Sequence, residues 1–337
     1  MAAKAKKRAP AKKARSKTTK SEAGRVTKSQ ARRRPTGAKQ RSVAARKKTR
    51  PAAAKRKAAV KSAIVESDKL EGLNGPDPRL MEGQAPIWNR LMDHYFRLEI
   101  DGWEKIPDEP SLLIGIHSGG PLTMDAWTVV LSWWRHFGES RKLHGTAHDV
   151  LMKAPLIGEY FRKLGAISPS RESIQAAFDK GDDVILWPGG ELDAYRTWAT
   201  KRDTAVLGGR KGFVRLAIRS GVPIVPMATV GGHDTLFVLS EGRGLAKVLK
   251  LKERMRSDVA PITLSVPFGI TLHLTPFQHI PLPAKIRTSF LDPIYLEKDP
   301  AKADDEEYVD QVYHMIEGAI QQGMNKLAKK RKFPVFG

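Results

Sequence analysis

The segment Leu112-Leu-Ile-Gly-Ile-His117-Ser-Gly-Gly-Pro-Leu-Thr-Met-Asp125 contains the pattern on which the predicted fold depends. Its first five residues form a compact apolar run, which predicts a buried strand. Gly119 and Gly120 then permit a tight turn, and residues 125–136 have a helical pattern with Thr123 or Asp125 as the candidate N-cap. His117 therefore lies at the carboxyl end of a strand, where open α/β sheets place their sites.

A second apolar run, 184–187, ends in Pro188-Gly189-Gly190-Glu191-Leu-Asp193 and also predicts a buried strand that enters a glycine-rich turn. Paired glycines can offer backbone N–H groups to an oxyanion or a phosphate. Both segments also have a plain structural interpretation. The first could be a strand-end His satisfied by the backbone, and the second an ordinary turn.

Short apolar runs and helical patterns alternate through the rest of the chain. Strands are predicted at 223–228, 270–274 and 289–294, and helices at 87–96, 150–164 with a break near Pro155, 170–179, 208–220 and 308–327. This alternation predicts an α/β fold with a central, mostly parallel sheet flanked by helices. We expect one domain over residues 85–332, preceded by a linker over 66–84 and a tail over 1–65. The helix at 87–96 is expected to pack on its own domain, with a membrane interface as the alternative.

The net positive charge of the chain lies in its first 62 residues. They hold 24 of the 59 Lys and Arg and one of the 36 acids, so the remaining residues carry 35 of each. This distribution excludes a uniformly basic nucleic-acid-binding globule. Residues 1–62 contain no Leu, Ile, Phe, Tyr or Trp, which predicts a disordered segment. Its expected partner is an anionic membrane surface, with nucleic acid, or no single partner, as alternatives.

The chain has no Cys, which excludes a disulfide scaffold, a thiolate metal site and a Cys nucleophile. No apolar run is long enough to span a bilayer, and the N-terminus lacks a secretory signal, so we expect a cytoplasmic, peripheral protein on the inner face of the membrane. His144 and His148 have metal-ligand spacing, but a structural role is expected and no metal site is predicted. The Gly231-Gly232-His233-Asp234 segment could line the same cleft as His117.

Four blocks in order make the chain resemble the glycerolipid acyltransferase superfamily, with features of its diacylglycerol acyltransferase-like members. The blocks are His117…Asp125, Leu164-Gly165-Ala-Ile-Ser-Pro-Ser-Arg171-Glu172, Trp187-Pro188-Gly189-Gly190-Glu191-Leu-Asp193 and Val222-Pro-Ile-Val-Pro226. The resemblance implies an acyltransferase-like fold and transfer of a fatty acyl group from acyl-CoA or acyl-carrier-protein to the hydroxyl of a glycerolipid or other lipid alcohol. It implies no bound cofactor, since the acyl thioester is a co-substrate.

The same resemblance implies roles for individual residues. His117 would be the general base and Asp125 the partner that orients it. Gly119, Gly120, Gly189 and Gly190 would offer N–H groups to the oxyanion or to phosphate, and Arg171 would contact an acidic head group or CoA. Glu191 and Asp193 would complete the substrate-binding set, and either could orient the His if Asp125 does not.

Two departures from the family pattern bear on the substrate and the catalytic pair. Seven residues separate His117 from Asp125 where the family has four, and the third block has Gly189 where phosphate-type members have Glu. The second departure favours an uncharged lipid alcohol as acceptor. The alternatives are a thioesterase or hydrolase on the same scaffold, a polyanion-binding protein that acts through its basic tail, and an inactive relative.

Overall fold

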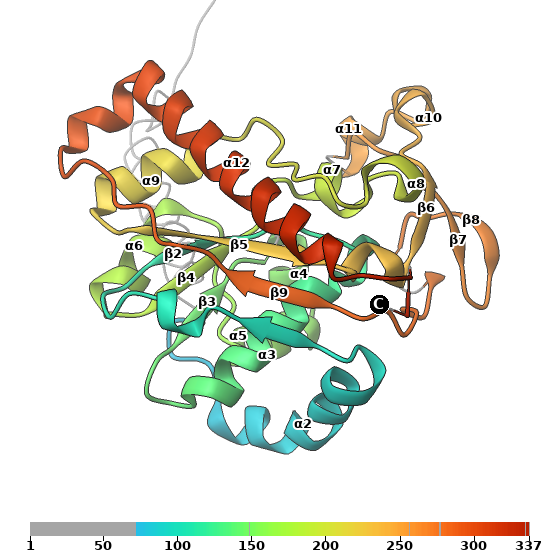
Figure 1. Cartoon of the computed structure of the whole chain (residues 1–337), viewed down its shortest axis with the longest axis horizontal. Coiled ribbons are helices and arrows are strands. Elements are labelled where there is room, and N and C mark those ends of the chain that lie inside the picture. The colour runs from blue at the N-terminus through green and yellow to red at the C-terminus, as the bar shows by residue number, and fades with distance from the viewer. Residues whose placement is uncertain (1–71, 148, 256, 276–277, 334, 337) are drawn as a thin grey trace, which may run out of the picture. The chain divides into compact units, whose positions relative to one another are not determined.

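A computed structural model describes residues 72–337 except positions 148, 256, 276–277, 334 and 337 (Figure 1). The predicted tail and the first part of the predicted linker therefore lie outside the described residues. Six strands form the main sheet in the order β1-β9-β5-β2-β4-β3. Every neighbouring pair is parallel except β5 with β9, which is antiparallel, so the prediction of a mostly parallel sheet is confirmed. These strands are β1 (Glu99–Asp101), β2 (Leu112–Ile114), β3 (Leu143–Gly145), β4 (Asp183–Leu186), β5 (Ile224–Val230) and β9 (Arg287–Phe290).

Helices cover both faces of this sheet, with α12 (Glu306–Lys329) and α3 (Met124–Phe137) on opposite sides (Figure 1). Side chains on β2 alternate between the two faces because successive residues of a strand point in opposite directions. Leu112 and Ile114 pack with α6 (Arg171–Asp179), α9 (Gly212–Ser220) and α12. Leu113 packs with Val129 and Trp133 of α3 on the other face. The strand is buried on both faces, which explains why its sequence is apolar throughout.

The remaining elements surround this core. The helices are α2 (Pro78–Arg90), continued by a π-helical turn at Leu91–Tyr95, α4 (Asp149–Lys153), α5 (Ile157–Lys163), α7 (Glu191–Ala194), α8 (Trp198–Lys201), α10 (Arg243–Val248) and α11 (Leu251–Met255). A separate antiparallel sheet has the order β6-β7-β8, with β6 (Phe237–Ser240), β7 (Ile262–Ser265) and β8 (Gly269–Leu272). No helix in the described part of the chain is both long enough and apolar enough to span a membrane.

The first helix differs from its prediction, because α2 begins at Pro78 inside the expected linker rather than at residue 87. Asp77 caps it, accepting hydrogen bonds from the backbone N–H groups of Arg79 at 2.9 Å and Leu80 at 3.4 Å. An Asp before a Pro is a strong helix-start signal. The prediction failed because it relied on the apolar stripe, which begins more than two turns later.

Candidate active site

Three glycine-rich loops meet at the carboxyl edge of the sheet. The strands β5, β2 and β4 are adjacent and parallel, with β2 in the middle. The loop after β2 carries His117, the loop after β4 carries the Pro188–Asp193 segment, and the loop after β5 carries Gly231–Asp234. Because parallel neighbours end at the same edge, segments more than a hundred residues apart become neighbours in space.

His117 and Asp125 form a pair despite their seven intervening residues. His117 Nδ1 lies 3.2 Å from Asp125 Oδ2. The chain turns back through positive φ angles at Gly119, Gly120 and Thr123, and this bulge brings the second residue of α3 to the imidazole. Thr123 occupies the N-cap position, which confirms that alternative, although its side chain makes no cap bond. Asp125 is not the cap, because it lies inside the helix with its carboxylate toward His117.

The Asp125 carboxylate is fully buried and its second oxygen is also satisfied. Asp125 Oδ1 accepts hydrogen bonds from the Ser118 backbone N–H at 2.8 Å and from the Ser118 hydroxyl at 3.1 Å. The His117 side chain is 20% exposed, and within the described residues no group hydrogen-bonds its Nε2. The arrangement fixes the imidazole through Nδ1 and leaves Nε2 as the atom that can exchange a proton with a ligand.

Trp187, the residue after β4, supports the imidazole from one side. Its ring stacks on the His117 ring with centroids 4.9 Å apart and planes 7° apart. The indole lies over Gly115, where an added Cβ would come within 2.9 Å of the indole nitrogen. The sequence pattern assigned no role to Trp187, because stacking between residues 70 positions apart leaves no local signal.

Asp193 holds the backbone of His117 rather than its ring. The carboxylate accepts a hydrogen bond from the His117 backbone N–H and is ion-paired with Arg196. Arg196 also donates to the carbonyl oxygens of His117 at 3.2 Å, Lys201 at 3.1 Å and Arg202 at 3.4 Å. Burial lowers the pKa of Arg196 to about 10, so the guanidinium stays charged at neutral pH. The alternative that Asp193 orients the imidazole is therefore not what the structure shows.

His233, in the loop after β5, holds the glycine turn that follows His117. Its Nδ1 accepts a hydrogen bond from the Gly119 backbone N–H at 2.9 Å. Burial, together with the Arg196 charge, keeps the pKa of His233 well below its ordinary value, so the ring remains neutral and can accept this bond. The next residue, Asp234, accepts from Trp198 Nε1 at 2.7 Å and pairs with Arg331 at 3.2 Å. The Gly231–Asp234 segment thus joins the site.

The glycines predicted to serve an oxyanion fall into two groups. The N–H of Gly119 is bonded to His233, and that of Gly190 is bonded to the carbonyl oxygen of Trp187 at 3.3 Å. Neither N–H is available to a ligand in this conformation, which corrects the expectation for these two residues. For Gly120 and Gly189, the role of offering an N–H group to an oxyanion or a phosphate remains a proposal. The physical reason for the two exceptions is that a tight turn uses its own N–H groups to close.

The remaining predicted residues lie outside the His117 pair. Glu191 is bound by Arg210, whose guanidinium approaches its two oxygens at 3.1 and 3.2 Å. Arg171 is exposed at the first position of α6, and no hydrogen bond within the described residues joins it to His117. His144 is buried between the Gly165 carbonyl and Asp182, as its structural interpretation required, and His148 lies outside the described residues.

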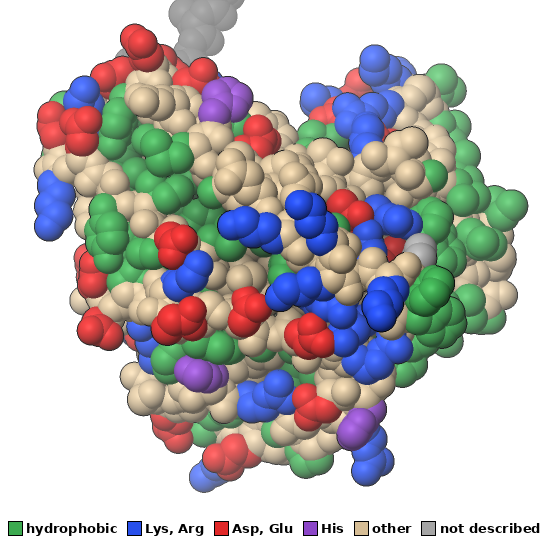
Figure 2. Space-filling view, viewed as in Figure 1, with side chains coloured by type: hydrophobic (Ala, Val, Ile, Leu, Met, Phe, Trp, Pro, Cys, Tyr) green, Lys and Arg blue, Asp and Glu red, His purple; other side chains and the backbone are tan. Residues whose placement is uncertain are grey.

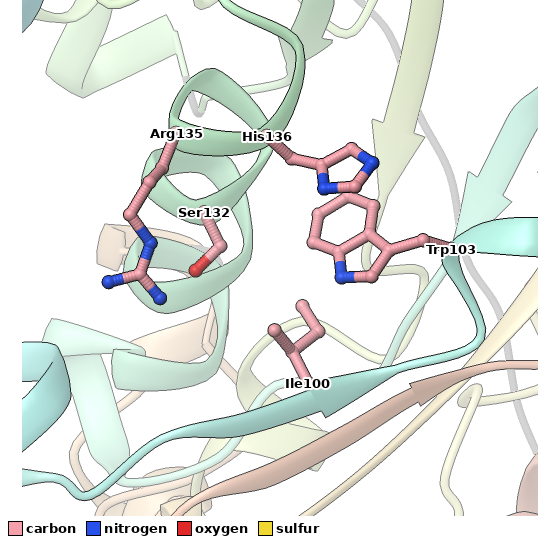
Figure 3. Close-up of a pocket in the computed structure, with 5 residues that line it drawn as sticks. All are labelled: Ile100, Trp103, Ser132, Arg135 and His136. Carbon is pink, nitrogen blue, oxygen red and sulfur yellow. The ribbon is translucent and has the colours of Figure 1, made fainter.

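The cavity of about 260 Å³ between α3, β1 and the turn at Trp103 lies away from this site (Figure 3). It is lined by Ile100, Trp103, Ser132, Arg135 and His136. Its α3 residues come from the last turns of that helix, whereas Asp125 lies in the first. His117 instead lies in a loop cluster, with part of its side chain exposed.

Gly189 is the glycine of the β4 loop at which a side chain should be least tolerated. A Cβ there would overlap the Val206 carbonyl oxygen and the Asp193 Cβ, so the backbone must shift. We expect Gly189→Ala to lower the free energy of unfolding by about 1–3 kcal/mol in urea titration. Gly244→Ala is the control, since nothing lies within 4 Å of its added Cβ. Equal stability of the two variants would contradict the packing described.

Comparison with known proteins identifies the family. A family model described as "Diacylglycerol acyltransferase" matches residues 84–333, more than half of the chain. An uncharacterised protein of Mycobacterium tuberculosis is 26% identical over 256 residues, covering 75% of this chain and 67% of that protein. Phytyl ester synthase 1, chloroplastic, of Arabidopsis thaliana is 25% identical over 256 residues, covering 69% of this chain and 34% of that protein.

Two further similarities involve smaller regions or weaker agreement. The "DGAT1/2-independent enzyme synthesizing storage lipids" of Gallus gallus is 27% identical over 183 residues, covering 54% of this chain and 50% of that protein. The crystal structure of the 1-acyl-sn-glycerophosphate (LPA) acyltransferase of Thermotoga maritima superposes with a TM-score of 0.42 and 18% identity, covering 70% of this chain and 73% of that one. The match over residues 84–333 shows that the chain belongs to the diacylglycerol acyltransferase family, and it is therefore an acyltransferase of the glycerolipid superfamily.

Proposed function

We propose that the protein transfers a fatty acyl group from an acyl thioester, either acyl-CoA or acyl-carrier-protein, to the hydroxyl of a neutral glycerolipid or another lipid alcohol. The observation that carries this proposal is the His117–Asp125 pair, in which Nδ1 is held at 3.2 Å and Nε2 remains open to a ligand. This is the geometry of a general base that is oriented by a carboxylate.

The proposed reaction proceeds by direct attack of the acceptor. His117 Nε2 takes the proton of the acceptor hydroxyl, and the hydroxyl oxygen attacks the thioester carbonyl carbon. Asp125 accepts from Nδ1–H and stabilises the imidazolium. When the tetrahedral intermediate collapses, the C–S bond breaks and the thiolate receives the proton from Nε2. The products are an ester and a free thiol, and no acyl-enzyme is formed.

The charges near His117 support an uncharged acceptor. Arg196 is buried and bound to Asp193 and three carbonyl groups, so it cannot meet a phosphate. Arg210 is held by Glu191 and by the Pro188 carbonyl oxygen at 3.0 Å. Both of these cations are therefore already paired. A phosphate-bearing acceptor that used either one would need to break its pair, whereas a neutral lipid alcohol would not.

The direct test measures release of free thiol from a long-chain acyl-CoA in the presence of one acceptor at a time. Because the chain has no Cys, a thiol reagent gives no background from the protein. The acceptors are monoacylglycerol, diacylglycerol, a long-chain alcohol and lysophosphatidate, each dispersed in vesicles. Release that requires a neutral acceptor supports the proposal. Release without any acceptor would indicate a hydrolase, and release only with lysophosphatidate would contradict the proposed acceptor class.

Asp125→Asn should lower kcat by roughly 10²–10⁴-fold and leave KM nearly unchanged. The reason is that an amide beside Nδ1 can hold the His117 imidazole in the wrong tautomer. The comparison is with Asp108→Asn, which removes an exposed carboxylate from the turn before β2. Steady-state rates with the best acceptor provide the measurement. If Asp125→Asn retained full activity, the carboxylate would not orient the base.

The basic segment 1–62 lies outside the described residues, and its partner remains a proposal. We propose an anionic membrane surface, because 24 basic residues with one acid attract such a surface by roughly 1 kcal/mol for each residue near the lipid. This attraction is electrostatic, so salt should weaken it. Vesicle binding at low and high salt separates it from apolar contact.

A further inference from the structure

Strands β7 and β8 of the small sheet have their polar and apolar faces reversed relative to an ordinary surface sheet, whereas β6 turns Val238 inward. A half-exposed antiparallel sheet normally turns apolar residues inward and polar residues outward. In β7 the residues Thr263 and Ser265 are buried, while Leu264 between them is 45% exposed. In β8 Ile270 is 71% exposed, while the adjacent Thr271 faces inward. The register places Leu264 directly opposite Ile270, so the two apolar side chains share the outer face.

The hydroxyl groups on the inner face lie within hydrogen-bond distance of one another. Thr263 Oγ1 lies 3.1 Å from Thr271 Oγ1 and 3.1 Å from Nδ1 of the buried His273. Ser265 Oγ lies 3.1 Å from Thr271 Oγ1. The hydrogen-bonded network shows that this orientation of the strands is specified by their side chains. A slip by one residue would bury the leucine and isoleucine but would expose the network.

The outer face is a continuous apolar surface that is exposed in the described structure. Phe268, in the β7–β8 turn, is 57% exposed. The other exposed apolar side chains of this face and its margins are Leu239, Val266, Leu272 and Ile280. Figure 2 shows hydrophobic side chains gathered over the region where Figure 1 places β7 and β8. Soluble proteins rarely leave such a patch uncovered unless it meets another surface.

Basic side chains border this face. Exposed Lys247 and Lys250 lie in α10 and just after it, together with the exposed Val248, and Lys252 of α11 is paired with Asp258 at 3.1 Å. Figure 2 shows Lys and Arg side chains in this region beside the apolar patch. Apolar residues beside a basic border match the interface of an anionic bilayer, where acyl chains lie beneath negative head groups.

We propose that the outer face of the β6-β7-β8 sheet is the surface that seats the enzyme in an anionic lipid bilayer. The sheet follows the site directly in sequence, because β6 begins two residues after the turn Gly232–Thr235 that contains His233. Phe237 of β6 also packs against Trp198 of α8 with ring centroids 4.8 Å apart. Seating this sheet therefore holds α8 and the turn that contains His233 close to the lipid surface. This inference rests on the proposed function in one respect, namely that the acceptor lipid is taken from the bilayer on which the sheet is seated.

The first experiment uses the absence of Cys to place one reporter at a chosen position. Ile270→Cys in the full chain is labelled with a polarity-sensitive thiol-reactive fluorophore and mixed with vesicles of phosphatidylcholine and phosphatidylglycerol. We expect a several-fold rise and a blue shift of emission as the label enters lipid. Met315→Cys, half-exposed on α12, is the matched control and should not respond. Ile87→Cys on α2 tests the alternative helix surface.

The second experiment measures affinity by vesicle sedimentation without acyl donor. Phe268→Ser with Ile270→Ser should weaken binding by about 100-fold, and Tyr295→Ser with Met315→Ser should change it less than about 3-fold. In about 1 M salt, where charges are screened beyond ~3 Å, wild-type binding should weaken but persist, and the sheet variant should lose binding. All four side chains are exposed, so we expect both variants to fold, and melting curves check this expectation.

Three outcomes would overturn the proposal. A response of the label at position 87 but not at 270 would move the contact to α2. Equal binding of both double variants, abolished by salt, would assign binding to the basic segment alone. A blue shift at position 270 that rises with protein concentration without vesicles would show that a second copy covers the sheet. An enzyme that binds vesicles through the sheet but transfers no acyl group would refute only the proposed function.

Discussion

Replacing His117 by alanine should lower the rate of acyl transfer by about 10²–10⁴-fold, because the substitution removes the only group proposed to take the acceptor proton. The fold should be retained. The His117 backbone N–H and carbonyl groups, which bind Asp193 and Arg196, are unchanged by the substitution. Thiol release at saturating acyl-CoA, together with a thermal unfolding curve, measures both quantities on one preparation.

The matched control is His314→Ala, which removes an exposed imidazole on α12 whose side chain is 65% exposed. We expect it to retain wild-type activity. Equal rates for His117→Ala and wild type would remove His117 from the mechanism and leave the loop cluster without a base.

Most of the main sheet was predictable because its central strands are buried on both faces. Leu112–Ile114 and Ile224–Val230 are apolar runs for that reason, and such runs are visible in the sequence. The edge strands β1 and β3 were missed, since each has only three residues and includes a polar or charged side chain. In the small sheet, the strand expected at 270–274 is confirmed by β8, whereas β6 and β7 were missed for a different reason. Apolar residues of these strands face outward, and a search for a buried strand does not recognise that reversal.

The candidate site was likewise predictable from the sequence only in part. The His117–Asp125 pair was predictable as a motif, but its geometry depends on a bulge that closes through the left-handed residues Gly119, Gly120 and Thr123. The role of His233 depends on a hydrogen bond across 114 residues, and the role of Trp187 on a ring stack across 70. Contacts at that range follow from sheet order, which the sequence pattern did not establish.

Arg196→Leu should lower the free energy of unfolding by about 3–5 kcal/mol, more than a substitution at any exposed ion pair of the site. Arg196 is 1% exposed and its partner Asp193 is fully buried. Removing the guanidinium leaves a buried carboxylate whose remaining hydrogen bond comes from the His117 N–H, and it deprives three backbone carbonyl oxygens of their donor. A loss of this size corresponds to a fall in melting temperature of roughly 10 °C.

The Arg210–Glu191 pair supplies the matched control, because it lies beside the same loop but its Arg side chain is 47% exposed. Arg210→Leu should cost less than about 1 kcal/mol, as exposed ion pairs usually do. A double-mutant cycle of Asp193→Leu and Arg196→Leu, followed by urea unfolding, should show that the double variant loses less than the sum of the single losses. Additive losses, or equal losses at Arg196 and Arg210, would mean that Asp193 and Arg196, which bind the His117 backbone, do not act as a buried ion pair. The Asp193–Arg196 pair therefore matters for catalysis as well as for stability, because a base can be oriented through its ring only if its backbone is held in place.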